Sequence, residues 1–189
     1  MEKRLIAWKY LSFAVVFATA IGALSQSHTS KHVKIPVIHA QPDDVSSPEA
    51  IVRATFDAQS GPVGMPRQWG RDRSLYDPNT ISVAAGPEPS TGTLKPRRWI
   101  SYQQYVDELD AYLVKTGFVD QPLGCVTNKR AYVATVTCGY EAREGSKVVE
   151  RGVDIFQLYS DGKRWWIRSV VWDKESPDNP IPPELLGRK

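Results

Sequence analysis

The most constraining feature of the sequence is a pair of alternating runs, 151–159 and 164–172, that are separated by Asp161-Gly162. Apolar and polar side chains alternate along both runs, which is the pattern of β-strands with one buried face. Asp-Gly between such runs favours a two-residue type I′ turn. The sequence therefore predicts an antiparallel hairpin.

The register of this hairpin decides which side chains share a face. A two-residue turn places Ser160 opposite Lys163 and Asp154 opposite Ser169, on a face that is otherwise apolar. The apolar members of that face are Phe156, Leu158, Trp165, Ile167 and Val171. An isolated buried charge is costly, so this carboxylate must neutralise, gain a partner or stand in a wet cavity. Asp154 is the candidate general base or ligand anchor, the alternative being a structural Asp that is bonded across the sheet or exposed at its rim.

A long amphipathic helix is predicted from Ser101 to Lys115. Its apolar stripe follows helical spacing and comprises Tyr102, Tyr105, Val106, Leu109, Tyr112 and Leu113. Ser101 with Gln104 forms a capping box, and Gly117 suits the left-handed residue that ends a helix. The tyrosines of the stripe either line a binding cavity or pack in the core with their hydroxyls at its edge.

The elements before this helix are shorter. A first helix is predicted to begin at Ser46-Ser47-Pro48-Glu49 and to end at Gly61-Pro62, and a second spans 67–75. Extended segments follow at 80–85 and 93–99. From residue 123 onward the pattern is that of strands, so helices come first and a run of strands follows.

Three stretches carry a family resemblance: SPEAIVRATFDA (47–58), RSLYDPNTISV (73–83) and RGVDIFQLYSDGKRWWIRSVVWDKE (151–175). Through them, residues 47–175 resemble the nuclear transport factor 2-like, or SnoaL-like, superfamily. The resemblance implies an α+β fold, a cone-shaped curved antiparallel sheet packed by N-terminal helices and one long amphipathic helix. It also implies a conical cavity and frequent dimerisation through the sheet.

The superfamily contains isomerases, polyketide cyclases, dehydratases and non-catalytic binding modules, so the fold does not choose the function. No motif of this chain aligns residue by residue with the sites of ketosteroid isomerases or SnoaL enzymes. Superfamily dehydratases use a His-Asp pair, and residues 47–189 contain no histidine. That absence also excludes Ser-His-Asp and Cys-His catalysis in the predicted domain.

All three histidines, His28, His32 and His39, lie in the segment 26–46, and their spacing matches no metal site. We expect no metal and no cofactor. The two cysteines lie on either side of a turn predicted at 128–130. Pairing Thr127 with Tyr132 would leave Cys125 and Cys138 about 13 Å apart, too far for a disulfide. Both cysteines are therefore predicted to be reduced.

The N-terminal residues have the features of a targeting signal. Residues 1–25 combine a basic start with a 14-residue apolar run, Leu11 to Leu24, and small residues before Gln26, which is typical of a secretory signal peptide. An uncleaved membrane anchor is the alternative. Residues 26–46 are predicted to be a disordered linker and 176–189 a Pro-rich C-terminal tail. We expect an exported protein, periplasmic or extracellular, with membrane contact only through an uncleaved N-terminal segment.

The charge of the chain argues against nucleic acid as a partner. The formal net charge is +3, and residues 1–25 supply +2 of it, which leaves +1 for the remainder. Three functions stay open: a domain that binds a small apolar or amphipathic molecule, a His-independent isomerase or cyclase with Asp154 as base, and a protein-binding module that forms a homodimer through its sheet. The candidate ligand-binding residues are Tyr105, Tyr112, Asp154, Phe156, Trp165 and Ile167.

Overall fold

The computed structural model describes residues 32–86, 93–99 and 101–187. The predicted signal peptide, 1–25, lies outside these residues, as does the first part of the predicted linker. None of the described helices has the length and apolar character needed to cross a membrane.

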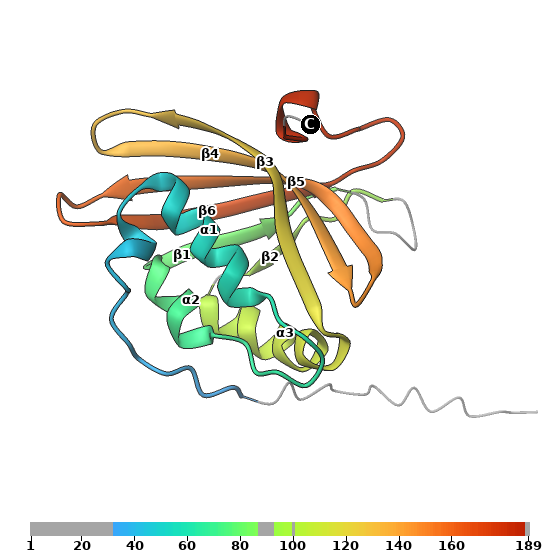
Figure 1. The fold of residues 1–189 in the computed structure, drawn as a ribbon, viewed down its shortest axis with the longest axis horizontal. Helices are drawn as coiled ribbons and strands as arrows, with labels where there is room; N and C mark the ends of the chain where they lie inside the picture. The colour runs from blue at the N-terminus through green and yellow to red at the C-terminus, as the bar shows by residue number, and fades with distance from the viewer. Residues whose placement is uncertain (1–31, 87–92, 100, 188–189) are drawn as a thin grey trace, which may run out of the picture.

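A curved six-stranded sheet forms one layer of the molecule, with the strand order β2-β1-β6-β5-β4-β3 (Figure 1). Its strands are β1 (Tyr76–Ala84), β2 (Arg97–Trp99), β3 (Phe118–Lys129), β4 (Val133–Glu144), β5 (Lys147–Ser160) and β6 (Trp165–Lys174). Neighbouring strands are antiparallel except β1 and β6, which run parallel. The predicted α+β fold with a curved sheet is confirmed, and the sheet is mixed because of this one pair.

Three helices pack against one face of the sheet: α1 (Pro48–Gln59), α2 (Trp69–Leu75) and α3 (Tyr102–Thr116) (Figure 1). The Ser101 hydroxyl accepts the Gln104 backbone N–H at 3.1 Å at the start of α3, and Gly117 ends this helix with a φ of 68°. Both helix-end predictions are confirmed. Ser47 caps α1 by accepting the backbone N–H of Ala50. The main core lies between α1 and the sheet, with Phe56 of α1 edge-on to Phe156 of β5.

The hairpin of β5 and β6 exists, but its predicted register is wrong. The Asp161 carboxylate accepts the backbone N–H groups of Lys163 and Arg164, at 2.8 and 2.9 Å, which lengthens the turn. Ser160 therefore lies opposite Trp165 rather than Lys163. A further register shift follows, so Val170 joins the buried face and Val171 is 38% exposed.

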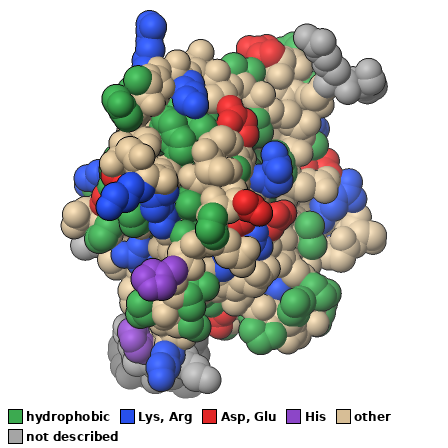
Figure 2. Space-filling model, turned by 60° about the vertical axis from the view of Figure 1, so that its left-hand side comes forward, with side chains coloured by type: hydrophobic (Ala, Val, Ile, Leu, Met, Phe, Trp, Pro, Cys, Tyr) green, Lys and Arg blue, Asp and Glu red, His purple; other side chains and the backbone are tan. Residues whose placement is uncertain are grey.

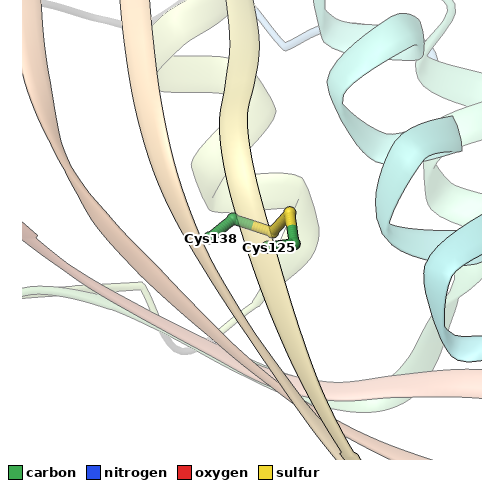
Figure 3. Close-up of a disulfide and its surroundings, with 2 residues drawn as sticks. All are labelled: Cys125 and Cys138. Atoms are coloured by element: carbon green, nitrogen blue, oxygen red, sulfur yellow. A yellow bond between two sulfur atoms is a disulfide. The ribbon is translucent and has the colours of Figure 1, made fainter. Parts of the chain in front are cut away.

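The prediction of two reduced cysteines is also wrong. Cys125 of β3 lies directly opposite Cys138 of β4, and their sulfur atoms form a disulfide of 2.02 Å with the Cα atoms 4.1 Å apart (Figure 3). The hairpin turns later than predicted, since the Arg130 N–H donates to the Val133 carbonyl. Thr127 consequently pairs with Val136 instead of Tyr132, and this shift brings the cysteines together.

Two terminal segments, which contain the short 3-10 helices η1 (Asp43–Val45) and η2 (Pro183–Leu185), also pack on the domain. Residues 32–46, the described part of the predicted linker, run along the helices, and the Val33 N–H donates to the Asp107 carboxylate of α3 at 2.7 Å. On the opposite face of the sheet, the C-terminal segment buries Ile181 and Leu185 (Figure 1). Gly139 makes room for it, because a Cβ there would lie 2.4 Å from the Leu185 carbonyl oxygen.

Candidate functional site

A pocket of about 180 Å³ lies between the helices and the inner face of the sheet. Residues of α1 and α3 form its helical side, and residues of β1 and β3 to β6 form the other. Aromatic side chains make up much of the lining, among them Phe56, Tyr105, Phe118, Tyr140, Phe156 and Trp172. The curvature of the sheet and the helices packed against it thus leave an aromatic cavity.

Asp154 of β5 contributes a carboxyl group to this cavity. It alternates with Phe156 and Leu158 on the buried face of the strand, and it is only 8% exposed. Its cross-strand neighbours are Cys138 on one side and Trp172 on the other. Within the described part of the chain, no side chain or backbone group donates a hydrogen bond or ion pair to it, which leaves a buried carboxyl facing the pocket without a partner.

Two more carboxyl groups line the same pocket. Asp120 of β3 and Glu150 of β5 flank Ala142 of β4 in one row across the sheet, and the small alanine leaves space between them. Glu150 is well bonded, because it accepts the Tyr140 hydroxyl at 2.6 Å and lies 2.5 Å from the Lys174 ammonium. Asp120 differs, since its buried Oδ1 atom has no hydrogen-bond donor among the described residues.

The carboxyl groups of Asp154 and Asp120 hold their protons more tightly than ordinary aspartates. Burial raises the pKa of Asp154 well above its usual value, and the negative charges of Asp120 and Glu150 raise it further. Burial followed by the Glu150 charge raises the pKa of Asp120 as well. Desolvation disfavours the charged form and a like charge adds to that effect, so the pair does not carry two full negative charges at neutral pH.

Four of the five tyrosine hydroxyls around the pocket are already engaged as donors, whereas that of Tyr76 accepts from the Gln59 amide at 3.5 Å and has no acceptor for its own proton among the described residues. Tyr105 donates to the Gln59 side-chain oxygen at 2.8 Å, Tyr102 to Asp72 at 2.6 Å, and Tyr140 to Glu150. Tyr112 donates to Glu144 at the exposed end of α3. Each hydroxyl has one proton to give, so these four have none left for a ligand unless a bond is broken.

The predicted ligand-binding residues divide into two groups. Tyr105, Tyr112, Asp154 and Phe156 line the pocket, whereas Trp165 and Ile167 do not. Both of the latter are buried in the main core, where the Lys129 ammonium lies 5.3 Å from the Trp165 ring centroid. Asp154 shares its face with the buried Phe156, Leu158, Trp165 and Ile167, as predicted. Val171 does not belong to that face, and Trp172 rather than Ser169 lies opposite Asp154.

Several lining residues were missed at the sequence level. Glu150 lies four residues before Asp154 on β5, and side chains at even spacing on a strand share a face. The alternation that identified Asp154 could therefore have identified Glu150 as well. Asp120 lies two residues after Phe118 on β3, so the alternation of this strand places both side chains on one face. Tyr140 depends on a glycine: a Cβ at Gly152 would lie 2.8 Å from the Tyr140 hydroxyl, so the ring fits only because that position has no side chain.

The charged residues that line the pocket are all acidic. Asp120, Glu150 and Asp154 are its charged residues, and no Lys, Arg or His lines it within the part of the chain that the structure describes. The same residues contain no group of three or more His, Cys, Asp or Glu side chains that could hold a metal ion. The site offers carboxyl groups, aromatic faces and one side-chain amide, that of Gln59.

No protein-family model matches the sequence, and no curated protein matches it either. Among solved structures, a protein provisionally described as a ketosteroid isomerase from Parabacteroides distasonis is 15% identical, with a TM-score of 0.46 over 69% of this chain and 89% of that one. An NTF2-like protein of unknown function from Methylobacillus flagellatus is 11% identical, with a TM-score of 0.44 over 74% and 98% of the two chains.

A protein from Thiobacillus denitrificans, provisionally described as a calcium/calmodulin-dependent protein kinase type II association domain, is 10% identical, with a TM-score of 0.48 over 75% and 99% of the two chains. We take nothing about function from these similarities. The order of elements and the curved sheet closed by helices are the features that the family resemblance implied.

Proposed function

We propose that the chain binds a small, largely apolar molecule in the pocket and does so without catalysis. The observation that carries this proposal is Asp154, a buried carboxyl group that faces an aromatic cavity and has no partner among the described residues. Ligand pockets are typically apolar, with a few polar groups that orient the ligand. Asp154 supplies such a group, since buried polar atoms are normally satisfied.

An isomerase or cyclase with Asp154 as general base is the second candidate, because an unpartnered, desolvated carboxyl group is also what a base requires. Such an enzyme needs a donor for the oxyanion that forms on its substrate. Four pocket tyrosines, Tyr102, Tyr105, Tyr112 and Tyr140, donate to other side chains, which leaves Tyr76 as the tyrosine that could serve. Binding alone requires only the unpartnered carboxyl group and no such donor, and for that reason we favour it.

Native mass spectrometry of the protein isolated from its own host tests the proposal. We expect a retained mass that is lost in Ala142→Leu, which fills the pocket between Asp120 and Glu150, and kept in Asp178→Asn, an exposed position. Protein that carries no ligand and gains none from host extract would refute binding. If the chain converted an unsaturated ketone and Asp154→Asn lost that activity, the isomerase would replace the binding function as the proposal.

We also propose that the outer face of the sheet forms a homodimer. Val126, Thr137, Ile155 and Val171 lie in one row across β3 to β6, and all but Thr137 are exposed. An exposed β-branched row of this kind favours sheet-to-sheet contact. Light scattering should give twice the monomer mass for the chain and a monomer for Ile155→Lys. Arg53→Glu, an exposed change on α1, should stay dimeric; a monomeric parent chain would refute the interface.

Export remains a proposal that the disulfide supports, because disulfides persist mainly in oxidising compartments. Mature protein is expected to begin close to Gln26, and intact Met1 in a membrane fraction would favour an anchor. Nucleic acid is not proposed as a partner. On the face of the molecule that Figure 2 shows, acidic side chains lie among the basic ones instead of leaving a continuous basic surface.

A further inference from the structure

The pocket contains more carboxyl groups than the surrounding cations and hydrogen-bond donors can satisfy. Of its three acids, Glu150 is paired with the Lys174 ammonium and the Tyr140 hydroxyl. Asp154 has no donor, and neither does the Oδ1 atom of Asp120, within the described residues. One acid is therefore compensated by the protein and two are left for a ligand to satisfy.

These two carboxyl groups select the charge of the ligand. An anion brought into the pocket would lie against Asp120 and Asp154 and gain no basic side chain from the lining. A carbonyl or ether has only acceptors, so it can use only a proton that the carboxyl pair retains and leaves the other carboxyl oxygens without a donor. An ammonium group has three donors and a positive charge, and hydrogen bonds between ions are about twice as strong as those between neutral groups.

The walls of the pocket suit the same kind of ligand. Trp172 lines it and is held in place by stacking on Trp99, with ring centroids 5.3 Å apart and planes inclined by 12°. Tyr105, which also lines it, packs edge-on against Trp99, with ring centroids 5.5 Å apart, and is fixed by its bond to Gln59. Aromatic surfaces stabilise both a ligand ring and a nearby cation.

The volume of the pocket limits the size of the ligand. An engineered apolar cavity of about 150 Å³ accommodates one benzene molecule. The pocket here measures about 180 Å³, which is room for one ring and a short arm. We infer that the ligand is a primary amine with one aromatic ring and a short alkyl chain, its ring against Phe56, Phe156 and Trp172 and its ammonium group between Asp154 and Asp120. This inference rests on the proposed binding function.

Three compounds of equal size and different charge test the inference: 2-phenylethylamine, 2-phenylethanol and phenylacetate. Calorimetry on the whole chain should rank the amine first, the alcohol at least about ten-fold weaker, and phenylacetate without measurable binding. Asp154→Asn should weaken the amine by at least about ten-fold and leave the alcohol within about three-fold, because only the amine uses the charge. Asp178→Asn, the same change at an exposed position, should alter neither.

Proton release gives a second readout that a structural role for Asp154 would not produce. An alkylamine stays protonated at neutral pH, so any proton released on binding comes from the carboxyl pair. Titrations in two buffers of different ionisation enthalpy should show release for the amine and none for the alcohol, and Asp154→Asn should reduce the release.

The outcomes separate this inference from the proposed function. If the alcohol bound as tightly as the amine, and Ala142→Leu abolished the binding of both, the inference of an amine ligand would be refuted. The pocket would still be a binding site. Failure of all three compounds would overturn the amine inference, while the retained mass of protein from its host decides the binding function independently. Equal affinity of Asp154→Asn and the parent chain for the amine would also overturn the inference.

Discussion

Two buried aspartates, Asp72 in the helical layer and Asp154 in the sheet, have carboxyl groups that differ in their partners. Asp72 of α2 is fully buried, and its Oδ2 atom accepts the Tyr102 hydroxyl at 2.6 Å and the Gln59 amide at 3.1 Å. Asp154 of β5 is almost as buried and accepts nothing from the described residues. Burial raises the pKa of Asp72 to about 7, while the Tyr102 and Gln59 bonds oppose the rise; the pKa of Asp154 is also raised by burial, and well above its usual value.

This difference teaches that burial and a raised pKa do not identify a site by themselves. Asp72 shares both properties, yet it lies outside the pocket lining and joins α2 to α1 and α3 through hydrogen bonds. Asp154 faces a cavity and forms no hydrogen bond that links it to another element among the described residues. We infer that Asp72 stabilises the fold and that Asp154 is available to a ligand; Gln59, which contacts Asp72 and Tyr105, lies between the two regions.

The largest expected effect is the loss of stability in Asp72→Ala. This change leaves the buried Tyr102 hydroxyl and Gln59 amide without their acceptor, and two such groups cost about 4 kcal/mol in the free energy of unfolding. Urea denaturation measures it. Asp57→Ala, an exposed aspartate on α1, serves as control and should cost less than about 0.5 kcal/mol. If Asp72→Ala cost no more than its control, the structural role of Asp72 would be wrong.

Removal of the disulfide should come next and act on the sheet alone. The Cys125→Ala, Cys138→Ala double variant opens a loop whose ends are 13 residues apart, which removes about 3 kcal/mol in the chain-entropy account. The disulfide lies next to Asp154 and away from Asp72, so its effect should add to that of Asp72→Ala within about 0.5 kcal/mol. Free thiols in the denatured, unreduced parent chain would show that the bond does not form.

The two aspartates should also give stability a dependence on pH. A carboxyl group whose folded-state pKa is raised binds more protons in the folded than in the unfolded chain, so its contribution is complete below its ordinary value of 3.8 and is lost as pH rises through the folded-state pKa. Stability should therefore fall as pH rises from about 4 to about 7 through Asp72. Asp120, whose folded-state pKa is also about 7, and Asp154, whose pKa is raised as well, add to the fall.

Variants test each contribution to this pH profile. Asp72→Asn and Asp154→Asn should each reduce the fall in stability with rising pH, and the part that remains includes the contribution of Asp120. The titratable or charged groups that act on Asp154 or on its acidic neighbours are Tyr76 of β1, Tyr105 of α3, Asp120 of β3, Tyr140 of β4, Glu150 of β5 and Lys174 of β6. A profile that rises with pH in this range would contradict the assignment.

The sequence predicted those elements whose signals are local. The stripe of α3, its Ser101 cap and the terminal Gly117 each depend on a few neighbouring residues, and all appear in the structure. Strand registers depend on the turn as well, and the Asp161 carboxylate changed one of them by bonding two backbone N–H groups. The disulfide was missed for the same kind of reason, because a later turn was needed to bring the cysteines opposite each other.

The candidate site was predicted only in part for a related reason. Asp154 follows from the alternation of one strand, and the sequence could identify it. The grouping of Asp120 with Glu150 across Ala142 requires the registers of β3, β4 and β5 together. Tertiary pairing of this kind leaves no signal in any single segment, so the sequence could offer one carboxyl group but not the cluster that surrounds it.

The smallest expected effect, and the one that most sharpens the comparison, is that of Asp154→Asn on stability. The amide has nearly the same shape and no charge to desolvate. The free energy of unfolding should therefore change by less than about 1 kcal/mol, and the variant should gain relative to the parent chain as pH rises, because burial raises the pKa of the aspartate that it replaces. Thermal denaturation of the parent chain, Asp154→Asn and Asp72→Asn at two pH values measures this directly. A large loss in Asp154→Asn at both pH values would mean that this carboxyl group, like Asp72, holds the fold together, and neither the ligand anchor nor the general base would then be needed to explain its burial.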